Sequence, residues 1–185
     1  AHPPAEILDR LRREDYAPTQ RKATLEYLRR AETESFADPV AARAAAFLRE
    51  KQAEIRTLVE RAALYARQMR GQARELVLCH TDLHAGNLHI TPGGDFYIVD
   101  WDQPLLAPRE RDLMFIGGGQ GFRGMTPRQE REGFYPGYGA VEVDPAGLGY
   151  YRCERIVVDI ADFCRQILDS TRGREDREQG LHYLI

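Results

Sequence analysis

Two short apolar runs near the middle of the chain each end in polar side chains, and this arrangement restricts the fold more than any other feature. The first run, Glu75-Leu-Val-Leu-Cys79, leads directly into His80-Thr-Asp82-Leu-His84-Ala-Gly-Asn87. The second run, Phe96-Tyr-Ile-Val99, leads into Asp100-Trp-Asp102. Short apolar runs bounded by polar and turn residues are typical of β-strands. We therefore expect each set of polar groups to lie at the end of a strand.

The segment between the two sets has the composition of a hairpin. Pro92-Gly93-Gly94-Asp95 is typical of a turn, and the sequence predicts three strands, at 76–79, 88–91 and 96–99. A hairpin returns the chain to the point where it began. We therefore expect Asp82, Asn87 and Asp100 to lie close together.

The spacing of these three residues points to phosphoryl transfer. In eukaryotic-type phosphotransferases an Asp orients the acceptor hydroxyl, and an Asn five residues later and a second Asp hold Mg²⁺ on ATP. Asp82 is accordingly predicted to be the catalytic residue. Asn87 and Asp100 are predicted to bind Mg²⁺, which prefers oxygen ligands, and the nucleotide. A buried carboxylate at Asp100 would be costly without a partner, which favours a metal or hydrogen-bonding role.

The segment from about Asp38 to Leu168 resembles the aminoglycoside phosphotransferase/choline kinase-like (phosphotransferase enzyme) family. The family signature reads roughly His-Gly-Asp-Leu-His-x-x-Asn, followed by Asp-Trp or Asp-Phe. Here Thr81 stands where the family often has Gly, and Trp101 follows the second Asp. Three further segments are most similar to the spectinomycin phosphotransferase-like branch: Asp38-Pro-Val-Ala-Ala, Pro108-Arg-Glu-Arg-Asp112-Leu-Met-Phe-Ile and Tyr151-Arg-Cys-Glu-Arg155.

The resemblance implies a fold and an activity. The expected fold is α+β but mainly α, the C-terminal lobe of a protein-kinase-like fold with a small β-hairpin at the metal site. The expected activity is ATP- and Mg²⁺-dependent phosphorylation of a hydroxyl on a small molecule, for example an aminoglycoside or aminocyclitol antibiotic. Homoserine, choline and other small alcohols stay open as acceptors, as does the choice between ATP and GTP.

Four further residues are expected to support the site. By resemblance, His80 supports the loop by hydrogen bonding, and Asp112 braces the same loop from a following helix. His84 is also expected to be structural. Asp102 is expected either to support the metal ligands or bind metal-bound water, or to be a surface charge. The neighbouring run at 109–111 fits an ion-pair network or the rim of the site.

The chain is predicted to be a single domain, residues 1–185, that lacks the nucleotide-binding lobe. A kinase of this type needs an N-terminal lobe in which a β-hairpin covers the phosphates and a strand carries a Lys. The chain has only two lysines, Lys22 and Lys51, and neither lies in a β-branched strand run.

Composition excludes several other classes of protein. A net charge of −3 gives no basic footprint for nucleic acid. No apolar run approaches the ~18 residues of a membrane span, and no signal peptide is visible. The three cysteines, Cys79, Cys153 and Cys164, are widely spaced in apolar surroundings. They are expected to be reduced thiols in a cytoplasmic protein.

Hydrophobic periodicity and capping signals predict four helices, over 5–13, 19–30, 38–71 and 144–169. Thr19 is expected to cap the second. A long loop is expected over 117–139, with one helical turn at 126–132, and a polar connector over 170–179. Residues 119–124 match a dinucleotide-binding glycine pattern, but no crossover helix can follow it. A flexible loop near the acceptor is the better interpretation.

Two other readings stay open. His80, Asp82 and His84 alternate along the chain, so on an extended segment they would share one side, as the ligands of a metal-dependent hydrolase do. Zn²⁺ bound by both histidines would support a hydrolase, whereas Mg²⁺ bound only with nucleotide would support a kinase. The second alternative is a catalytically silent binding fragment.

Overall fold

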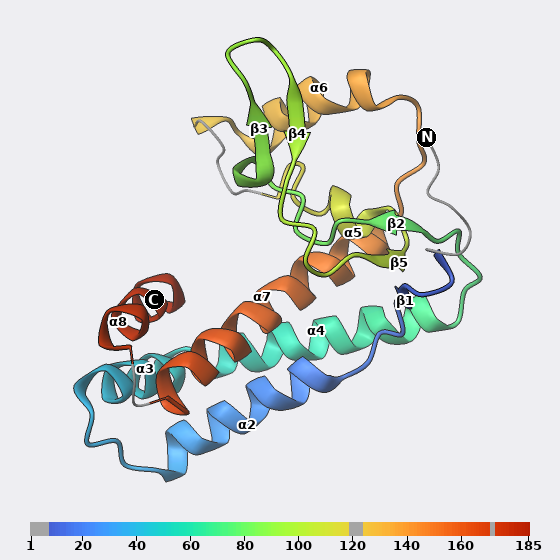
Figure 1. The fold of residues 1–185 in the computed structure, drawn as a ribbon. Coiled ribbons are helices and arrows are strands. Elements are labelled where there is room, and N and C mark those ends of the chain that lie inside the picture. Colours follow the sequence, from blue (N-terminus) through green and yellow to red (C-terminus); the bar gives the residue numbers. More distant parts are fainter. Residues whose placement is uncertain (1–7, 119–123, 171–172) are drawn as a thin grey trace. The chain divides into compact units, whose positions relative to one another are not determined.

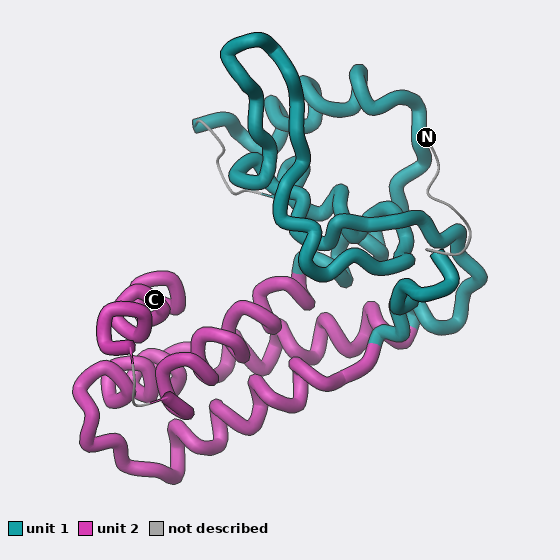
Figure 2. The backbone as a smooth tube through the Cα atoms, viewed as in Figure 1, with its two compact units in different colours: residues 1–16, 68–152 teal, residues 17–67, 153–185 magenta. Residues whose placement is uncertain are grey.

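The computed structural model describes residues 8–118, 124–170 and 173–185 (Figure 1). Its backbone divides into two compact units (Figure 2). Unit 1 comprises Ala1–Tyr16 and Gln68–Arg152, and unit 2 comprises Ala17–Arg67 and Cys153–Ile185. The fold is α+β and mainly helical, as predicted. Except for Gly124, the glycine pattern at 119–124 lies outside the described residues.

Unit 2 is helical. It is built from α2 (Thr19–Thr33), α3 (Pro39–Glu50), most of α4 (Gln52–Arg70), most of α7 (Pro145–Leu168) and α8 (Arg174–Leu184). Its core is apolar and contains Leu28, Leu48, Val59, Val157 and Ile167. The predictions of α2 and α7 are confirmed. Residue 18, and not Thr19, occupies the N-cap position of α2.

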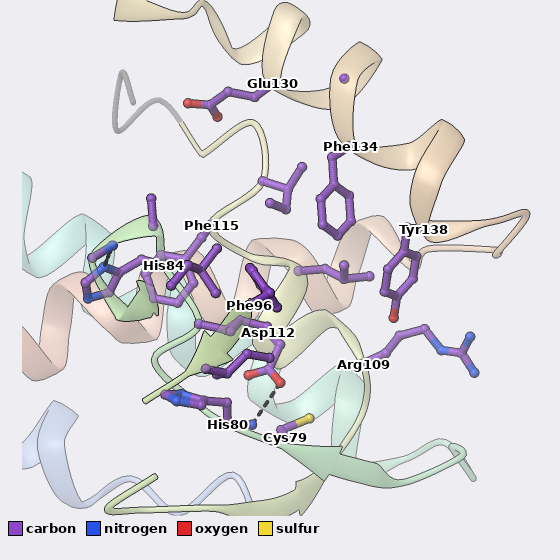
Figure 3. Close-up of a pocket in the computed structure, with 18 of the residues that line it drawn as sticks. Cys79, His80, His84, Phe96, Arg109, Asp112, Phe115, Glu130, Phe134 and Tyr138 are labelled. Carbon is purple, nitrogen blue, oxygen red and sulfur yellow. Dashed lines mark hydrogen bonds between the residues drawn. The ribbon is translucent and has the colours of Figure 1, made fainter. Parts of the chain in front are cut away.

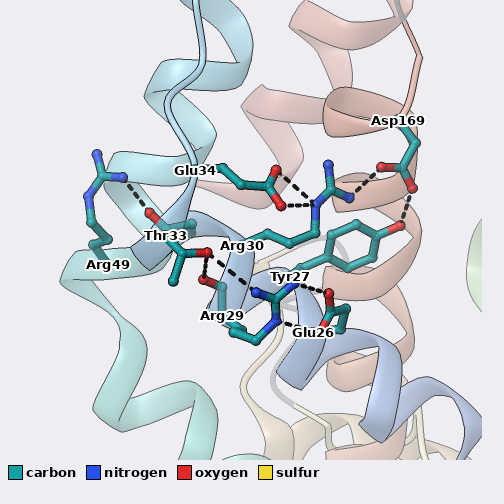
Figure 4. A network of polar contacts seen from close by, with 9 residues as sticks. Glu26, Tyr27, Arg29, Arg30, Thr33, Glu34, Arg49 and Asp169 are labelled. Carbon is teal, nitrogen blue, oxygen red and sulfur yellow. Dashed lines mark hydrogen bonds and ion pairs between the residues drawn. The ribbon is translucent and has the colours of Figure 1, made fainter.

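Polar contacts in unit 2 connect segments that are distant in sequence. Arg21 forms a buried ion pair with Glu154 at 2.5 Å. Asp169 accepts a hydrogen bond from the Tyr27 hydroxyl and pairs with Arg30, both at 2.6 Å (Figure 4). Burial, assisted by the hydrogen bond to Asp169, raises the pKa of Tyr27 to about 12. These contacts attach α2 to α7 and to the residue that follows it.

Two secondary-structure predictions are wrong, one of a single long helix and one of a connector. The predicted helix over 38–71 is two helices, since the backbone at Lys51 departs from helical geometry (φ −93°, ψ 8°). No Gly or Pro marks this break, so the apolar periodicity continues through it. The predicted connector over 170–179 overlaps α8, which begins at Arg174. Arg177 of α8 is buried and pairs with Asp38 at 2.7 Å, an interaction between distant residues that local polarity hides.

Unit 1 contains two small sheets. In the first, β5 (Leu105–Ala107) lies between β1 (Arg12–Arg13), which is parallel to it, and β2 (Val77–Cys79), which is antiparallel. In the second, β3 (Leu88–Ile90) pairs with β4 (Phe96–Ile98), and Ile90 lies opposite Phe96. The three predicted strands and the hairpin are confirmed. The helix expected over 5–13 is wrong at Arg12–Arg13, which form a strand.

The β3–β4 hairpin exposes much apolar surface. Ile90 is 72% exposed and Phe96 and Tyr97 are 56% and 54% exposed. Soluble proteins seldom expose several neighbouring large apolar side chains to this extent. A two-stranded ribbon has little core of its own in which to bury them. The hairpin is therefore the least buried part of the scaffold that carries the predicted site residues.

The loop expected over 117–139 contains a full helix, α6 (Pro127–Tyr138). Thr126 forms a capping box with Gln129: the Thr hydroxyl accepts from the Gln129 N–H, and the Gln side chain accepts from the Thr126 N–H. Pro136 lies within the last turn, and Gly139 ends the helix at φ 104°. The glycines and Pro136 pointed to a loop, whereas the capping box was the correct local signal.

Two further properties concern both units. All three cysteines are free thiols, and Cys79 and Cys164 are buried. Within the described ranges, no helix combines the length and apolar character needed to cross a membrane.

Candidate functional site

Asp112 holds the loop between β2 and β3 in place through two hydrogen bonds. This residue lies on α5 (Glu110–Leu113), and its two carboxylate oxygens accept hydrogen bonds from the backbone N–H of His80 at 2.8 Å (Figure 3) and from that of Thr81 at 2.7 Å. Burial raises the pKa of the Asp112 carboxyl, although both hydrogen bonds oppose the shift. One side chain therefore fixes the first two residues of the loop.

Thr81 adopts a left-handed backbone conformation with φ 79°. This conformation costs an L-residue about 1–2 kcal/mol, and a β-branched residue is especially unfavourable there. The position is the one at which Gly is frequent in the resembling family, and Gly adopts this conformation without steric cost. Thr81 is also buried, and its hydroxyl donates to the Gln103 carbonyl at 3.3 Å. The contacts of the loop compensate for local strain at this residue.

The ring of His80 connects the loop to the end of β4. Its Nε2 bonds the carbonyl oxygen of Val99 at 2.8 Å, and its Nδ1 accepts from the N–H of Asp82 at 3.3 Å. The ring is buried against Trp101, with 4.6 Å between ring centroids. Because a carbonyl oxygen can only accept, Nε2 carries the proton. Both ring nitrogens are thus used by backbone groups, and neither has a lone pair free to bind a metal.

Hydrogen bonds bring the three predicted site positions together. The Asn87 side-chain NH₂ donates to the carbonyl oxygen of Asp82 at 2.9 Å. The Asn87 carbonyl accepts from the N–H of Val99, which directly precedes Asp100, at 3.0 Å. Asn87 lies in the short 3₁₀ helix η1 (Ala85–Asn87) and is buried. Asn87, like His80, therefore joins the loop to the hairpin.

Asp100 is exposed, so the expectation of a buried carboxylate was wrong. Its backbone is left-handed, with φ 68°. Across the described ranges, its side chain makes no hydrogen bond or ion pair within the protein. Sparsely populated backbone conformations are concentrated at functional sites. The strained backbone and the available carboxylate now support a binding role, in place of the burial argument. Asp102 is likewise exposed, and its side chain makes no hydrogen bond or ion pair with the residues that the structure describes.

The chemistry of the available donors fits Mg²⁺ better than Zn²⁺. The Asn87 side-chain oxygen accepts no hydrogen bond from the described residues, and the Asp100 carboxylate is also available. Both are hard oxygen donors. No group of three or more His, Cys, Asp or Glu side chains that could hold a metal occurs among the described residues. The arrangement fits a cation that is held partly by another group, such as a phosphate.

A cavity of about 840 Å³ lies beside the loop, within unit 1. Its wall is mainly apolar and includes the aromatic side chains of Phe96, Phe115, Phe134 and Tyr138 (Figure 3), together with that of Trp101. Its polar lining includes His84, Arg109 and Glu130. Two of the aromatic residues belong to α6, so this wall was missed when that segment was expected to be a loop.

The run at 109–111 has three separate functions in the structure. Arg109 pairs with Glu75 and lines the cavity. Glu110 is buried and accepts from the N–H of Asp144 at 2.9 Å. The guanidinium of Arg111 lies over the ring of Tyr151, 5.7 Å from its centroid. Only Arg109 therefore reaches the rim of the site.

These features, a short braced loop followed by a hairpin, occur in a protein that belongs to the phosphotransferase enzyme family, whose sequence model matches residues 3–151. Two solved structures are similar over nearly the whole chain. Both are of spectinomycin phosphotransferase, APH(9)-Ia.

One structure, in complex with ADP and spectinomycin, shares 36% identity at a TM-score of 0.87, covering 98% of this chain and 55% of that chain. The AMP-bound complex shares 35% identity at a TM-score of 0.84, covering 99% and 57%. The resemblance to the family and to its spectinomycin phosphotransferase-like branch is confirmed. The chain spans about half the length of these two structures. A comparison with curated protein sequences gave no match.

Proposed function

We propose that residues 1–185 form the C-terminal, catalytic lobe of a phosphotransferase that transfers a phosphoryl group from ATP to a hydroxyl of a small molecule. One observation carries this proposal: Asn87 is hydrogen-bonded both to Asp82 and to the residue before Asp100. Hydrogen bonds thus join the backbone positions that carry the three residue types expected of a phosphoryl-transfer site, in a chain of the matching family.

Each of these residues has a distinct proposed role. Asp82 contacts the acceptor hydroxyl, orients it and accepts its proton. Asn87, through its side-chain oxygen, and Asp100, through its carboxylate, would hold Mg²⁺. The metal, when bound, neutralises negative charge on the nucleotide phosphates. His80 and Asp112 keep the loop in place, and most of the catalytic effect then comes from positioning and charge neutralisation.

For the acceptor we propose an aminocyclitol or aminoglycoside. The support is the likeness to an enzyme that was crystallised with spectinomycin. The nucleotide complexes of the same enzyme support a nucleotide as the donor. The matching experiment is a screen of acceptor hydroxyls with the full-length protein and Mg·ATP, followed by identification of the phosphorylated product.

We further propose that the nucleotide-binding lobe lies outside residues 1–185. Lys22 is in α2 and Lys51 lies between α3 and α4, so neither is on a strand. The isolated chain is expected to bind Mg·ATP weakly and to turn over negligibly. Calorimetry that gave micromolar affinity for the isolated chain would contradict this assignment.

The role of Asp82 is tested by Asp82→Asn in the full-length protein. The substitution keeps the shape of the side chain and removes its charge. Turnover is expected to fall ~100-fold or more, as for a lost general base. The acceptor KM is expected to change little, since the effect lies in the transition state. Asp95→Asn, in the exposed hairpin turn, is the matched control. A wild-type rate for Asp82→Asn would refute the proposed function.

The hydrolase alternative gains no support from the structure. It requires His80 as a metal ligand, and both nitrogens of that ring bond backbone groups. In the assay above, it predicts loss of a bound metal in His80 and His84 variants and a requirement for added Zn²⁺.

A further inference from the structure

The ring of His84 is held in one orientation by three contacts. Its Nδ1 accepts a hydrogen bond from the N–H of Gly86 at 3.0 Å. The ring of Phe115 packs against it in a T-shaped arrangement, with 5.7 Å between ring centroids, at the wall of the cavity (Figure 3). Its Nε2 lies 3.5 Å from Oδ2 of Asp82. The ring is therefore placed between its own loop backbone and the proposed catalytic carboxylate.

The first contact determines where the ring carries its proton. A backbone N–H can only donate, so Nδ1 of His84 must be an acceptor. The neutral ring then carries its hydrogen on Nε2, the nitrogen that faces Asp82. At 3.5 Å these two atoms are farther apart than in an ordinary N–H···O hydrogen bond, and catalytic contacts commonly shorten only when the substrate binds.

Gly86 makes this arrangement possible. A Cβ atom at residue 86 would lie 2.7 Å from Cε1 of His84 and 3.0 Å from its Nδ1, which is too close for the ring to keep its place. The backbone of Gly86 has no positive φ, so the residue is not needed for backbone conformation. Gly86 is therefore needed because it has no side chain, which leaves room for the His84 ring.

We propose that His84 is a positioning residue that holds the Asp82 carboxylate through Nε2–H, so that Oδ1 is directed to the acceptor hydroxyl. This proposal rests on the proposed function, because it assigns a partner to the same catalytic group. It extends the expected structural role of His84 to a specific effect on turnover. A carboxylate with one oxygen held loses little orientational freedom when the acceptor binds.

Two substitutions separate the two bonds of the ring. In His84→Asn, the side-chain oxygen lies near the position of Nδ1 and can still accept from Gly86, but the side chain is too short to reach Asp82. In His84→Gln, the longer side chain can donate to Asp82 in place of Nε2. We expect His84→Asn to lower kcat roughly 10-fold or more, the effect of a lost hydrogen bond to a charged group, with little change in acceptor KM. We expect His84→Gln to recover most of that loss.

A third variant moves the ring without replacing it. Gly86→Ala is expected to lower kcat by a factor similar to that of His84→Asn, although His84 is still present. Combined with His84→Asn, it is expected to cause little additional loss, because the ring that it displaces is already absent. Thermal unfolding of all variants provides the comparison with a purely structural role, in which kcat would follow Tm across the series.

The ring proton is measured independently of activity. Nitrogen-15 NMR of the imidazole in the full-length protein is expected to show the Nε2–H form as the neutral tautomer of His84. Asp82→Asn is expected to shift the Nε2 resonance. An Nδ1–H form, or a wild-type kcat for His84→Asn, would overturn the proposal. If Asp82→Asn abolishes turnover while His84→Asn does not, the positioning role fails and the proposed function stands.

Discussion

Asp112→Ala removes the side chain that bonds the first two residues of the loop through their backbone N–H groups. Both groups belong to buried residues, with His80 2% and Thr81 6% exposed. Each buried donor left without an acceptor costs about 1–3 kcal/mol, so the two together cost about 2–6 kcal/mol. Part of this cost is offset, since Thr81 can then leave its left-handed conformation and recover about 1–2 kcal/mol. The net loss in the free energy of unfolding is expected to be about 2–3 kcal/mol.

The measurement is urea denaturation of the chain, followed by circular dichroism and extrapolated to water. Asp112→Asn keeps one acceptor oxygen but turns an NH₂ group toward the other N–H, so its loss is expected to be intermediate. Asp102→Ala is the control: it removes an exposed carboxylate with no contact in the described protein, and is expected to change stability by less than about 0.5 kcal/mol. A loss below about 1 kcal/mol for Asp112→Ala would show that the loop does not depend on this brace.

The same variant has a predicted pH dependence. The pKa of Asp112 is raised by burial, so the folded protein binds this proton more tightly than the unfolded chain does. The contribution of this carboxyl to stability is therefore greatest in acid and decreases as pH rises from the ordinary pKa of Asp through the raised value. The stability difference between wild type and Asp112→Ala is expected to shrink over that interval. A difference that grows with pH would contradict the sign of the shift.

Three further predictions concern strain, metal binding and the core of unit 2. Thr81→Gly and Thr81→Ala both remove the hydroxyl, but Gly tolerates the left-handed backbone, so Thr81→Gly is expected to be more stable by about 1 kcal/mol in the same urea assay; equal stabilities would show that Thr81 is not strained. Asp100→Ala is expected to lower turnover of the full-length enzyme by orders of magnitude with nearly unchanged stability, whereas Asn87→Ala is expected to lower both, because its NH₂ group bonds Asp82; near-normal turnover of either would refute that ligand assignment. Glu154→Ala removes the carboxylate that pairs with the buried Arg21 and is expected to cost about 3 kcal/mol, with Glu154→Gln costing less; equal losses for the two would show that the charge of Glu154 contributes nothing.

Local signals in the sequence were sufficient for the scaffold of the site. The strands before and after the loop, and the hairpin that joins Asn87 to Asp100, follow from short apolar runs and a Pro-Gly-Gly-Asp turn. These signals depend only on neighbouring residues. The positions of the strands and of the turn were therefore enough to predict that residues 82, 87 and 100 lie close together.

The rest depends on contacts between distant residues. β1 has two residues and pairs with β5 about 90 positions later, so neither strand has a pattern long enough to read. The exposure of Asp100 and the left-handed backbone at Thr81 are consequences of tertiary contacts with no local signal. The helix at 127–138, in contrast, does have a local signal in the sequence, because the capping box at Thr126 marks its start. The prediction of a loop there did not take this signal into account.

The exposed hairpin has a consequence for how this activity can change through mutation. Asn87 directly precedes β3 and Asp100 lies two residues beyond β4, so the geometry of a two-stranded ribbon determines how far apart the two proposed metal ligands lie. A ribbon of this kind has little stability of its own. Selection for faster turnover in the laboratory is therefore expected to accumulate substitutions at Ile90 and Tyr97, which do not line the cavity but change how often the two proposed ligands are correctly spaced. The hairpin is a place where the rate can be adjusted while the chemical groups stay the same.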